Sequence, residues 1–347
     1  MRFTLFMRRL GFGLLLVITL AGGWLLHGVF IAPTAASTER SLALNAPLYK
    51  ATVPISSVLE SSTGSNPVPL FALNSIISNQ FKLAAGLHPG RGQPIPAAAD
   101  VRELPVIDVT FYNWRGELLS GWLALHTAQA PVIILTHGTP GNRVSMLQRA
   151  AFLYKHGYNV LLFDFQSYGR SQGVMSTLGM VESEDILAAI SFLHGLPDTM
   201  YSKIGVLGLS MGATAAVLAA SRSGDIEALV AESCPVDATW VLADVPDDAT
   251  READQQWVQE VYGVDITQAR PIDYVSKLAG RTAIFFINGD ADDITPLPGM
   301  QALYQAAGAP KQFWIVPNAG HAQSFAIDPG GYMQRVDSFF DSYLRQT

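Results

Sequence analysis

Cysteine is almost absent from this sequence of 347 residues, which contains only Cys234. With one cysteine, no disulfide can form within the chain and no metal site can be built from several cysteines. The sequence also lacks a His-Glu-x-x-His motif, and its Asp-rich turns lack the twelve-residue spacing of an EF-hand loop. We therefore expect no metal and no cofactor, and the acidic turn Gly289–Asp293 is the alternative candidate for binding Ca²⁺.

Charged residues are also scarce, at 15% of the chain, and they are unevenly distributed. The first 38 residues contain three arginines and no acidic residue. The formal net charge is −7, and removing those three positive charges leaves −10 for the remaining residues. Such an acidic body argues against nucleic acid or an anionic membrane surface as its partner.

Between Leu10 and Ile31 the sequence has no Asp, Glu, Lys or Arg, and the three arginines precede this stretch. Roughly 20 such residues are enough to cross a bilayer, whereas the apolar core of a signal peptide usually has about 7–15. We predict a membrane anchor in residues 1–36, with the rest of the chain on the non-cytoplasmic side. The alternative is a signal peptide cleaved near Thr34–Ser37, which would leave a secreted or periplasmic protein. Residues 37–103 are interpreted as a spacer or a covering arm.

A regular alternation of strand and helix patterns begins near Leu104 and continues to the C-terminus. Residues 105–112 and 117–125 flank a turn, which predicts an antiparallel hairpin. Continuous apolar strands that alternate with helices then predict a mostly parallel sheet with helices on both faces, so the fold class is α/β over residues 104–347. The predicted strands are 132–136, 158–163, 204–207, 226–231, 282–287 and 312–316, and the predicted helices are 144–156, 177–193, the segment after Ser210, 299–306 and 333–344.

The strand Ile204–Leu207 is followed by Gly-x-Ser-x-Gly and then by a run of small residues typical of a closely packed helix. This context predicts a nucleophile elbow, in which a strained turn displays Ser210 at the end of the strand. Gly208 and Gly212 are expected to be structural, because a Cβ at either position would collide with the neighbouring strand or helix. The alternative is an ordinary turn of a parallel sheet in which the serine caps the helix.

Ligands of parallel sheets bind at the carboxyl ends of the strands, and the other candidate residues follow such ends. His137 and Gly138 come directly after the first parallel strand. The glycine lets the main chain approach a substrate, and the backbone N–H of Thr139 is expected to form an oxyanion hole with that of Met211. His137 itself is predicted to be structural, because a histidine that ends a buried strand is usually satisfied by loop carbonyl groups.

Two later loops can supply an acid and a base. Asp290, Asp292 and Asp293 compete for the role of the acid that orients a catalytic histidine, and a solvated acidic turn is the alternative reading. His321 is the only histidine that follows Ser210 in the sequence. A triad in the order Ser, Asp, His would therefore have to use His321 as the base.

With these motifs, residues 104–344 resemble the α/β-hydrolase superfamily, and specifically its serine aminopeptidase-like branch of small-lid esterases, lipases and thioesterases. The resemblance implies an α/β-hydrolase fold and assigns the acid to Asp292, through the stretch Gly289–Pro296. The chain departs from the usual Asp-x-Arg-Gly-x-Gly-x-Ser pattern, because Gln166 and Ser167 replace the customary Arg and Gly. This difference bears on the packing of that loop and on the acyl pocket, not on the triad.

The insertion at about 237–272 has the length expected for a small lid, and part of it shows helical spacing. A helix there would either cover the acyl pocket with Trp240 and Trp257 or pack into the core. Its acidic residues either bind the amino group of a peptide or form a solvated face. These residues are Asp244, Glu252, Asp254 and Glu260.

The favoured hypothesis is a membrane-anchored serine hydrolase that cleaves a carboxylic ester or thioester of a small or lipid-like acyl substrate through an acyl-enzyme on Ser210. The alternatives are an aminopeptidase-like enzyme and a catalytically silent binding protein with the same fold. The sequence does not determine the acyl length, the leaving group or the oligomeric state.

Overall fold

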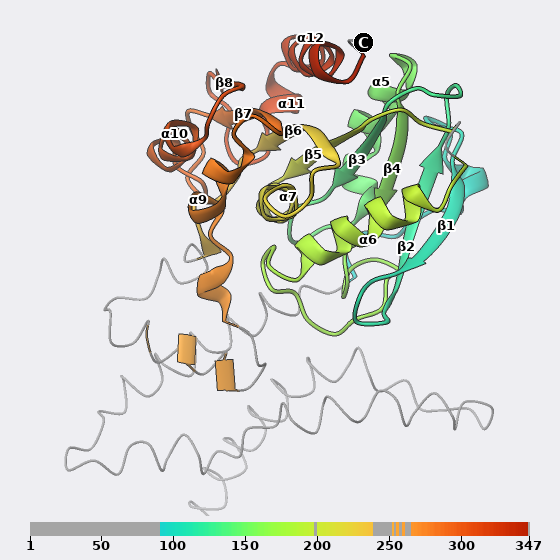
Figure 1. Ribbon diagram of the computed structural model, residues 1–347, viewed down its shortest axis with the longest axis horizontal. Helices are drawn as coiled ribbons and strands as arrows, with labels where there is room; N and C mark the ends of the chain where they lie inside the picture. Colours follow the sequence, from blue (N-terminus) through green and yellow to red (C-terminus); the bar gives the residue numbers. More distant parts are fainter. Residues whose placement is uncertain are drawn as a thin grey trace, which may run out of the picture. The chain divides into compact units, whose positions relative to one another are not determined.

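The computed structural model describes residues 91–197, 200–238, 252, 255, 256, 259, 260 and 265–345. The described residues belong to one compact unit. Its centre is an eight-stranded sheet in the order β1-β2-β4-β3-β5-β6-β7-β8 (Figure 1). The strands are β1 Ile107–Tyr112, β2 Leu118–Ala124, β3 Val132–Thr136, β4 Asn159–Phe163, β5 Ile204–Leu209, β6 Ile226–Glu232, β7 Ala283–Gly289 and β8 Lys311–Val316.

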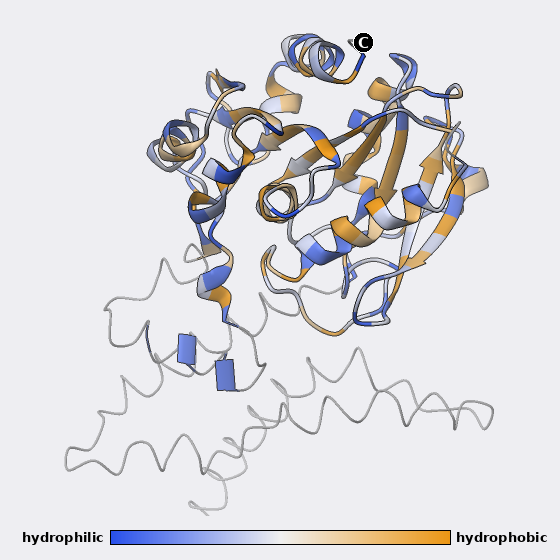
Figure 2. Ribbon diagram, in the orientation of Figure 1, coloured by the Kyte–Doolittle hydropathy of each residue, from blue (hydrophilic) through white to orange (hydrophobic). Residues whose placement is uncertain are grey.

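The first two strands pair antiparallel, and β2 also runs antiparallel to β4, whereas all pairs from β4 to β8 are parallel. Strands β3, β4 and β5 are buried along their whole length, because helices cover both faces of the sheet. This confirms the predicted α/β architecture and its N-terminal hairpin. Figure 2 shows the central strands coloured as hydrophobic, whereas helix α6, which covers them, carries both hydrophobic and hydrophilic residues.

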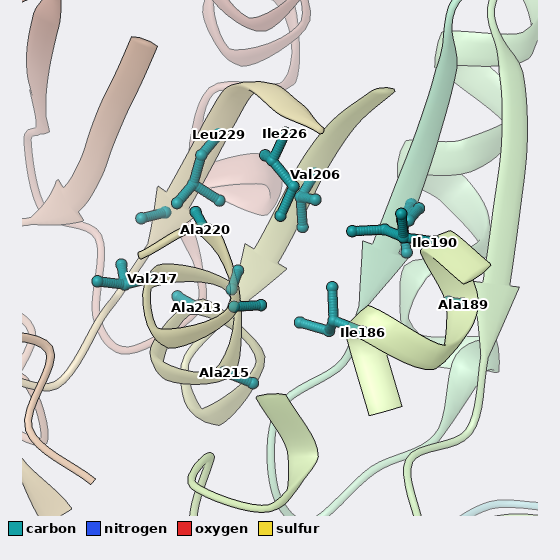
Figure 3. Packing of buried hydrophobic residues seen from close by; sticks show 14 of the residues in the cluster. Ile186, Ala189, Ile190, Val206, Ala213, Ala215, Val217, Ala220, Ile226 and Leu229 are labelled. Atoms are coloured by element: carbon teal, nitrogen blue, oxygen red, sulfur yellow. The ribbon is translucent and has the colours of Figure 1, made fainter. Parts of the chain in front are cut away.

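The helices divide between the two faces of the sheet. On one face α6, α7 and α10 contribute to a core with β5 and β6, and Figure 3 shows Ile186 and Ile190 of α6 near Val206 of β5. On the other face α5 and α12 pack against the sheet. The helices are η1 Ala98–Asp100, η2 Arg143–Met146, α5 Leu147–Lys155, α6 Glu182–His194, α7 Met211–Ala220, η4 Ile266–Gln268, α9 Pro271–Tyr274, η5 Val275–Leu278, α10 Leu297–Ala306, α11 Ser324–Ile327, α12 Pro329–Phe340 and η6 Asp341–Arg345.

One predicted helix begins later than expected. The pattern predicted a helix from residue 177, but α6 begins at Glu182. Leu178 and Gly179 have φ angles of 59° and 112°, which a right-handed helix excludes. The carboxylate of Glu182 instead accepts hydrogen bonds from the Thr177 hydroxyl at 2.6 Å and from the Gly179 N–H at 2.9 Å, so these residues form a turn before the helix.

The described end of the predicted spacer or covering arm packs against the sheet. Val101 is buried in the core that contains α5 and α12. The carbonyl groups of Arg91 and Gln93 accept hydrogen bonds from the Asn142 side chain, which lies in the loop after β3. The arm therefore contacts one of the loops that follow the carboxyl ends of the strands.

Within the described ranges, no helix has both the length and the hydropathy needed to cross a membrane. The predicted anchor, Leu10–Ile31, lies outside those ranges. Its role as an anchor or as a signal peptide stays a prediction.

Candidate active site

Ser210 lies between the end of β5 and the first residue of α7, and its backbone has φ 54° and ψ −119°. A non-glycine residue at positive φ stores strain, which must be held by its surroundings. The Ser210 N–H donates to the carbonyl oxygen of Glu232 at 2.9 Å, which ties the turn to β6. The Ser210 side chain makes no capping hydrogen bond to α7, so the structure contradicts the capping alternative.

The glycines on either side of Ser210 pack against backbone. A Cβ at Gly208 would lie 2.6 Å from the carbonyl oxygen of Gly212, and a Cβ at Gly212 would lie 2.5 Å from that of Thr136. A Cβ at Gly138 would lie 3.1 Å from the Ser210 Cβ. The turn is therefore compact: the main chains of α7, of the elbow and of the end of β3 pack so closely that no side chain fits between them.

His321 lies between Ser210 and Asp292. Its Nε2 is 2.9 Å from the Ser210 Oγ, and its Nδ1 is 3.0 Å from Asp292 Oδ2 and 3.1 Å from Oδ1. The other two aspartates of the loop are exposed, and Asp290 accepts a hydrogen bond from the Asn318 N–H. The structure thus brings together Ser210, Asp292 and His321 from three loops, and among the three aspartates only Asp292 contacts the histidine.

The carboxylate of Asp292 is completely buried but well satisfied. Burial raises its pKa, but hydrogen bonds from His321 and Thr295 outweigh burial and leave the pKa below its ordinary value. Thr295 donates to Asp292 through both its N–H and its hydroxyl, each at 2.7 Å. Thr295 was not among the predicted site residues, although an Asp followed three residues later by Thr is a spacing that allows such local bonds.

His137 is fully buried and both of its ring nitrogens are occupied. Nδ1 lies 2.8 Å from the Gly138 carbonyl oxygen, and Nε2 accepts a hydrogen bond from the Phe165 N–H at 3.2 Å. These partners require the tautomer with the proton on Nδ1. Burial lowers the pKa of His137, which favours its neutral form. His137 therefore has no free nitrogen with which to deprotonate Ser210.

Met211 directly follows Ser210 in the chain, and Thr139 lies in the loop after β3. Met211 is the first residue of α7, so its N–H has no acceptor within the helix. Its side chain is buried, and its Sδ accepts a hydrogen bond from the Tyr168 hydroxyl at 3.2 Å. Thr139 directly follows Gly138, which approaches Ser210. An oxyanion hole formed by the N–H groups of Thr139 and Met211 stays a prediction.

The loop after β4 carries the departure from the family pattern. Ser167 has φ 64°, a left-handed conformation that glycine, the customary residue, adopts without strain. The loop is anchored by Asp164, which forms a buried ion pair with Arg143 at 2.9 Å and accepts a hydrogen bond from the Arg170 N–H. The loop is therefore held in place by Asp164, while Ser167 introduces backbone strain.

A second buried ion pair lies at the end of β6 and was not predicted. The Glu232 carboxylate binds the Arg149 guanidinium at 2.9 Å and accepts a hydrogen bond from the Tyr332 hydroxyl at 2.8 Å. Glu232 directly follows the apolar run Ala228–Ala231, and an acidic residue at the end of such a buried run is a signal for an ion pair, because a buried carboxylate needs a partner. The partners lie 83 and 100 residues away, so the sequence alone does not identify them.

Most of the predicted lid lies outside the described residues, including Trp240, Trp257, Asp244 and Asp254. Glu252 and Glu260 are described, and both are exposed. Across the described ranges, no group of three or more His, Cys, Asp or Glu side chains could hold a metal ion.

The family described as X-Pro dipeptidyl-peptidase (S15 family) matches residues 94–279, which is more than half of the chain and includes Ser210. This chain belongs to the S15 family. The S15 family is an α/β-hydrolase family, so the predicted resemblance to the α/β-hydrolase superfamily is confirmed and the chain is a hydrolase.

This S15-family chain also has relatives among bacterial and fungal proteins. The protein Rv2307c of Mycobacterium tuberculosis (strain ATCC 25618 / H37Rv) is described as uncharacterized; it is 30% identical over 239 residues, which are 68% of this chain and 79% of the relative. The thiohydrolase aneE of Aspergillus aculeatus is 32% identical over 152 residues, which are 43% of this chain and 48% of that protein.

Among solved structures, the esterase Pf2001 of Pyrococcus furiosus is similar with a TM-score of 0.62 at 25% identity, over 74% of this chain and 98% of the esterase. Est1E of Butyrivibrio proteoclasticus, solved with ferulic acid bound, has a TM-score of 0.58 at 18% identity, over 69% of this chain and 100% of Est1E. The likeness to Est1E supports the fold alone.

Proposed function

We propose that this chain is a serine hydrolase that cleaves carboxylic esters or thioesters through an acyl-enzyme on Ser210. The observation that carries the proposal is the position of His321, which lies within hydrogen-bond distance of both Ser210 and Asp292. A nucleophile, a base and a group that orients the base are the parts that acyl transfer requires.

In the proposed mechanism, His321 Nε2 takes the proton from the Ser210 hydroxyl while Oγ attacks the carbonyl carbon of the substrate. The N–H groups of Thr139 and Met211 stabilise the negative charge on the carbonyl oxygen. When the tetrahedral intermediate collapses, the histidine returns its proton to the leaving alcohol or thiol. A water molecule then follows the same steps and releases the acid. Asp292 keeps the proton of the neutral imidazole on Nδ1 and stabilises the charged form.

The similarity to a Pyrococcus esterase and to a fungal thiohydrolase supports an ester or thioester as the substrate. The name of the matching family supports a second candidate, a peptidase. In that case Glu252 and Asp254 of the insertion would bind the free N-terminus of a peptide. The hydrogen-bonded arrangement of Ser210, His321 and Asp292 argues against a silent binding protein, because such a protein does not need these three groups in contact.

The test is labelling with a fluorescent fluorophosphonate, together with hydrolysis of p-nitrophenyl esters and thioesters of increasing acyl length. We expect labelling and turnover in the native chain and neither in Ser210→Ala, since the nucleophile is removed. Hydrolysis of aminoacyl or X-Pro arylamides that falls in Glu252→Gln and Asp254→Asn would favour the peptidase. A folded native chain that neither labels nor turns over any of these substrates would refute both.

We also propose that residues 1–36 anchor the enzyme in a membrane, with the catalytic residues on the non-cytoplasmic side. The charge-free stretch Leu10–Ile31 and the arginines before it support this topology. Extraction of the membrane fraction with alkaline carbonate should leave the full chain in the pellet. Release of a shortened chain that begins near Ser37 would instead indicate a cleaved signal peptide.

A further inference from the structure

The end of β6 lies between the nucleophile turn and the histidine loop. In the sheet β6 is the neighbour of both β5, which leads to Ser210, and β7, which leads to Asp292 (Figure 1). Glu232, the last residue of β6, accepts the Ser210 N–H at its carbonyl oxygen. The next residue, Ser233, donates its N–H to the carbonyl oxygen of Ile287 in β7 at 2.9 Å. Two adjacent residues thus connect the strands that carry the nucleophile and the acid.

Ser233 makes one further contact, through its side chain. Its Oγ accepts a hydrogen bond from the N–H of Ala322, the residue after His321, at 3.1 Å. Ser233 is fully buried and has φ 49°, so its backbone is in the left-handed region that only glycine adopts without strain. Ala322 also has a positive φ of 60°. Both ends of this hydrogen bond are therefore in conformations that the surrounding contacts must hold.

The residue before Ser233 is fixed by the buried ion pair with Arg149. The Arg149 guanidinium also lies over the ring of Phe325, 4.9 Å from its centroid. Phe325 belongs to α11, and Tyr332, the second partner of Glu232, belongs to α12; both helices follow the histidine loop in the sequence. The same cluster that holds the end of β6 therefore also holds the segment that follows His321.

We propose that Ser233 is a positioning residue, whose hydroxyl tethers the histidine loop and sets the distance between His321 Nε2 and Ser210 Oγ. This inference rests on the proposed function, because the distance matters only if His321 is the base for Ser210. Ser233 does not touch the reacting atoms. It acts through the backbone of Ala322, while Glu232 and Arg149 keep the end of β6 in place.

The physical reason is that proton transfer requires the base within hydrogen-bond reach of the nucleophile. A displacement of about 1 Å in a catalytic group can cost about 100-fold in rate. Without the Ser233 hydroxyl, the Ala322 N–H loses its acceptor and the loop can move away from Ser210. Substrate binding does not depend on this bond, so the loss should appear in kcat and not in KM.

The experiment compares Ser233→Ala and Ser233→Gly with a matched control, Ser324→Ala. Ser324 is also a fully buried serine close to His321 in the sequence, but its hydroxyl has no hydrogen-bond partner among the residues that the structure describes. Active sites are counted with the fluorophosphonate, and kcat per site and KM are measured with a p-nitrophenyl ester. We expect kcat per site to fall about 10- to 100-fold in both Ser233 variants, with KM unchanged, and to stay native in Ser324→Ala.

Comparing the two Ser233 variants separates a loss of activity caused by a displaced histidine loop from a loss caused by lower stability. Both remove the hydroxyl, but glycine also removes the Cβ that makes a φ of 49° costly, so Ser233→Gly should unfold at a higher temperature than Ser233→Ala. Equal losses of kcat at unequal stability support the tether. Native kcat per site in both variants would overturn it, even if fewer molecules fold.

A second measurement does not depend on a substrate. The hydrogen-bonded Nδ1 proton of His321 should give a downfield ¹H NMR signal in the native chain, assigned by its loss in Asp292→Asn. Weakening or loss of this signal in both Ser233 variants, but not in Ser324→Ala, supports the tether. An unchanged signal in all of them would overturn the tether. If the native chain hydrolyses nothing and does not label, the proposed function fails and this NMR comparison alone decides on the tether.

Discussion

At the scale of single residues, the candidate site is held together by a chain of hydrogen bonds that runs from the serine through the histidine to the aspartate. The Ser210 hydroxyl has His321 as its partner, and His321 in turn has Asp292. Asp292 accepts further bonds from Thr295, which leave its oxygens with little freedom to turn away from the imidazole. The orientation of the base is thus set by a buried carboxylate that is itself held by a threonine.

Replacing Asp292 with Asn should leave the fold intact and reduce kcat by roughly 10³- to 10⁴-fold, because an amide no longer selects the tautomer that accepts the serine proton. The measurement is kcat for a p-nitrophenyl ester in Asp292→Asn. Asp293→Asn is the control, since that carboxylate is exposed and makes no contact with the histidine in the described structure. Equal activity of the two variants would argue against Asp292 as the acid.

At the scale of elements, the elbow requires backbone-to-backbone packing between α7 and the end of β3. Gly212 lies in α7, where alanine would normally favour the helix. In this helix the added Cβ would meet the carbonyl oxygens of Thr136 and His137 at 2.5 and 2.7 Å. Intrinsic helix propensity is therefore outweighed by the tertiary contact.

We expect Gly212→Ala to destabilise the protein by about 1–3 kcal/mol, the range for overpacking a tight interior. The matched control is Gly330→Ala, because Gly330 also lies in a helix but no atom of the described residues lies within 4 Å of the position of its Cβ. That control should gain up to about 1 kcal/mol from helix propensity. Urea unfolding measures both changes, and a Gly212→Ala variant as stable as the control would contradict this packing argument.

At the scale of the whole molecule, several buried charges connect elements that are distant in the sequence. Arg149 and Glu232 join α5 to β6, and Arg143 and Asp164 join η2 to the loop after β4. Asp185 of α6 is a different case, because it has no cationic partner among its described contacts. Its oxygens accept hydrogen bonds from the Asn113 side chain and the Gln166 N–H, at 2.9 and 2.8 Å.

Burial raises the pKa of Asp185 to about 8, and the nearby carboxylates Glu182 and Glu117 add to the increase. The folded protein then holds a proton that the unfolded chain, with the ordinary value of 3.8, releases. Asp185 should therefore make the protein less stable as pH rises from about 4 to about 8. In Asp185→Asn this loss should disappear, so the variant should gain stability relative to the native protein as pH rises through that window.

The measurement is the midpoint of urea unfolding at pH 5 and pH 8.5 for both proteins. Asp100→Asn, which removes an exposed carboxylate, controls for the general change in charge. A difference between Asp185→Asn and the native protein that is the same at both pH values would show that Asp185 is ionised in the folded state across this range.

The sequence by itself determined the elements and their order, because local patterns encode them. The apolar run Val132–Thr136 became β3 with unchanged bounds, and the Gly-x-Ser-x-Gly stretch after β5 became a strained turn at Ser210. Buried strands need continuous apolar residues and a tight elbow needs small neighbours, and both requirements can be read within ten residues. Chain order likewise left His321 as the only histidine that could follow the serine.

Only the tertiary structure decided which groups meet. The contacts of Asp292 with His321, of Arg149 with Glu232 and of Ser233 with Ala322 join residues 29 to 89 positions apart. The spacing of hydrophobic residues indicates which face of a helix or strand is buried. It does not indicate which other element packs against that face. The start of α6 shows the same limit, because the helical pattern before Glu182 gave way to a turn held by the carboxylate of Glu182 itself.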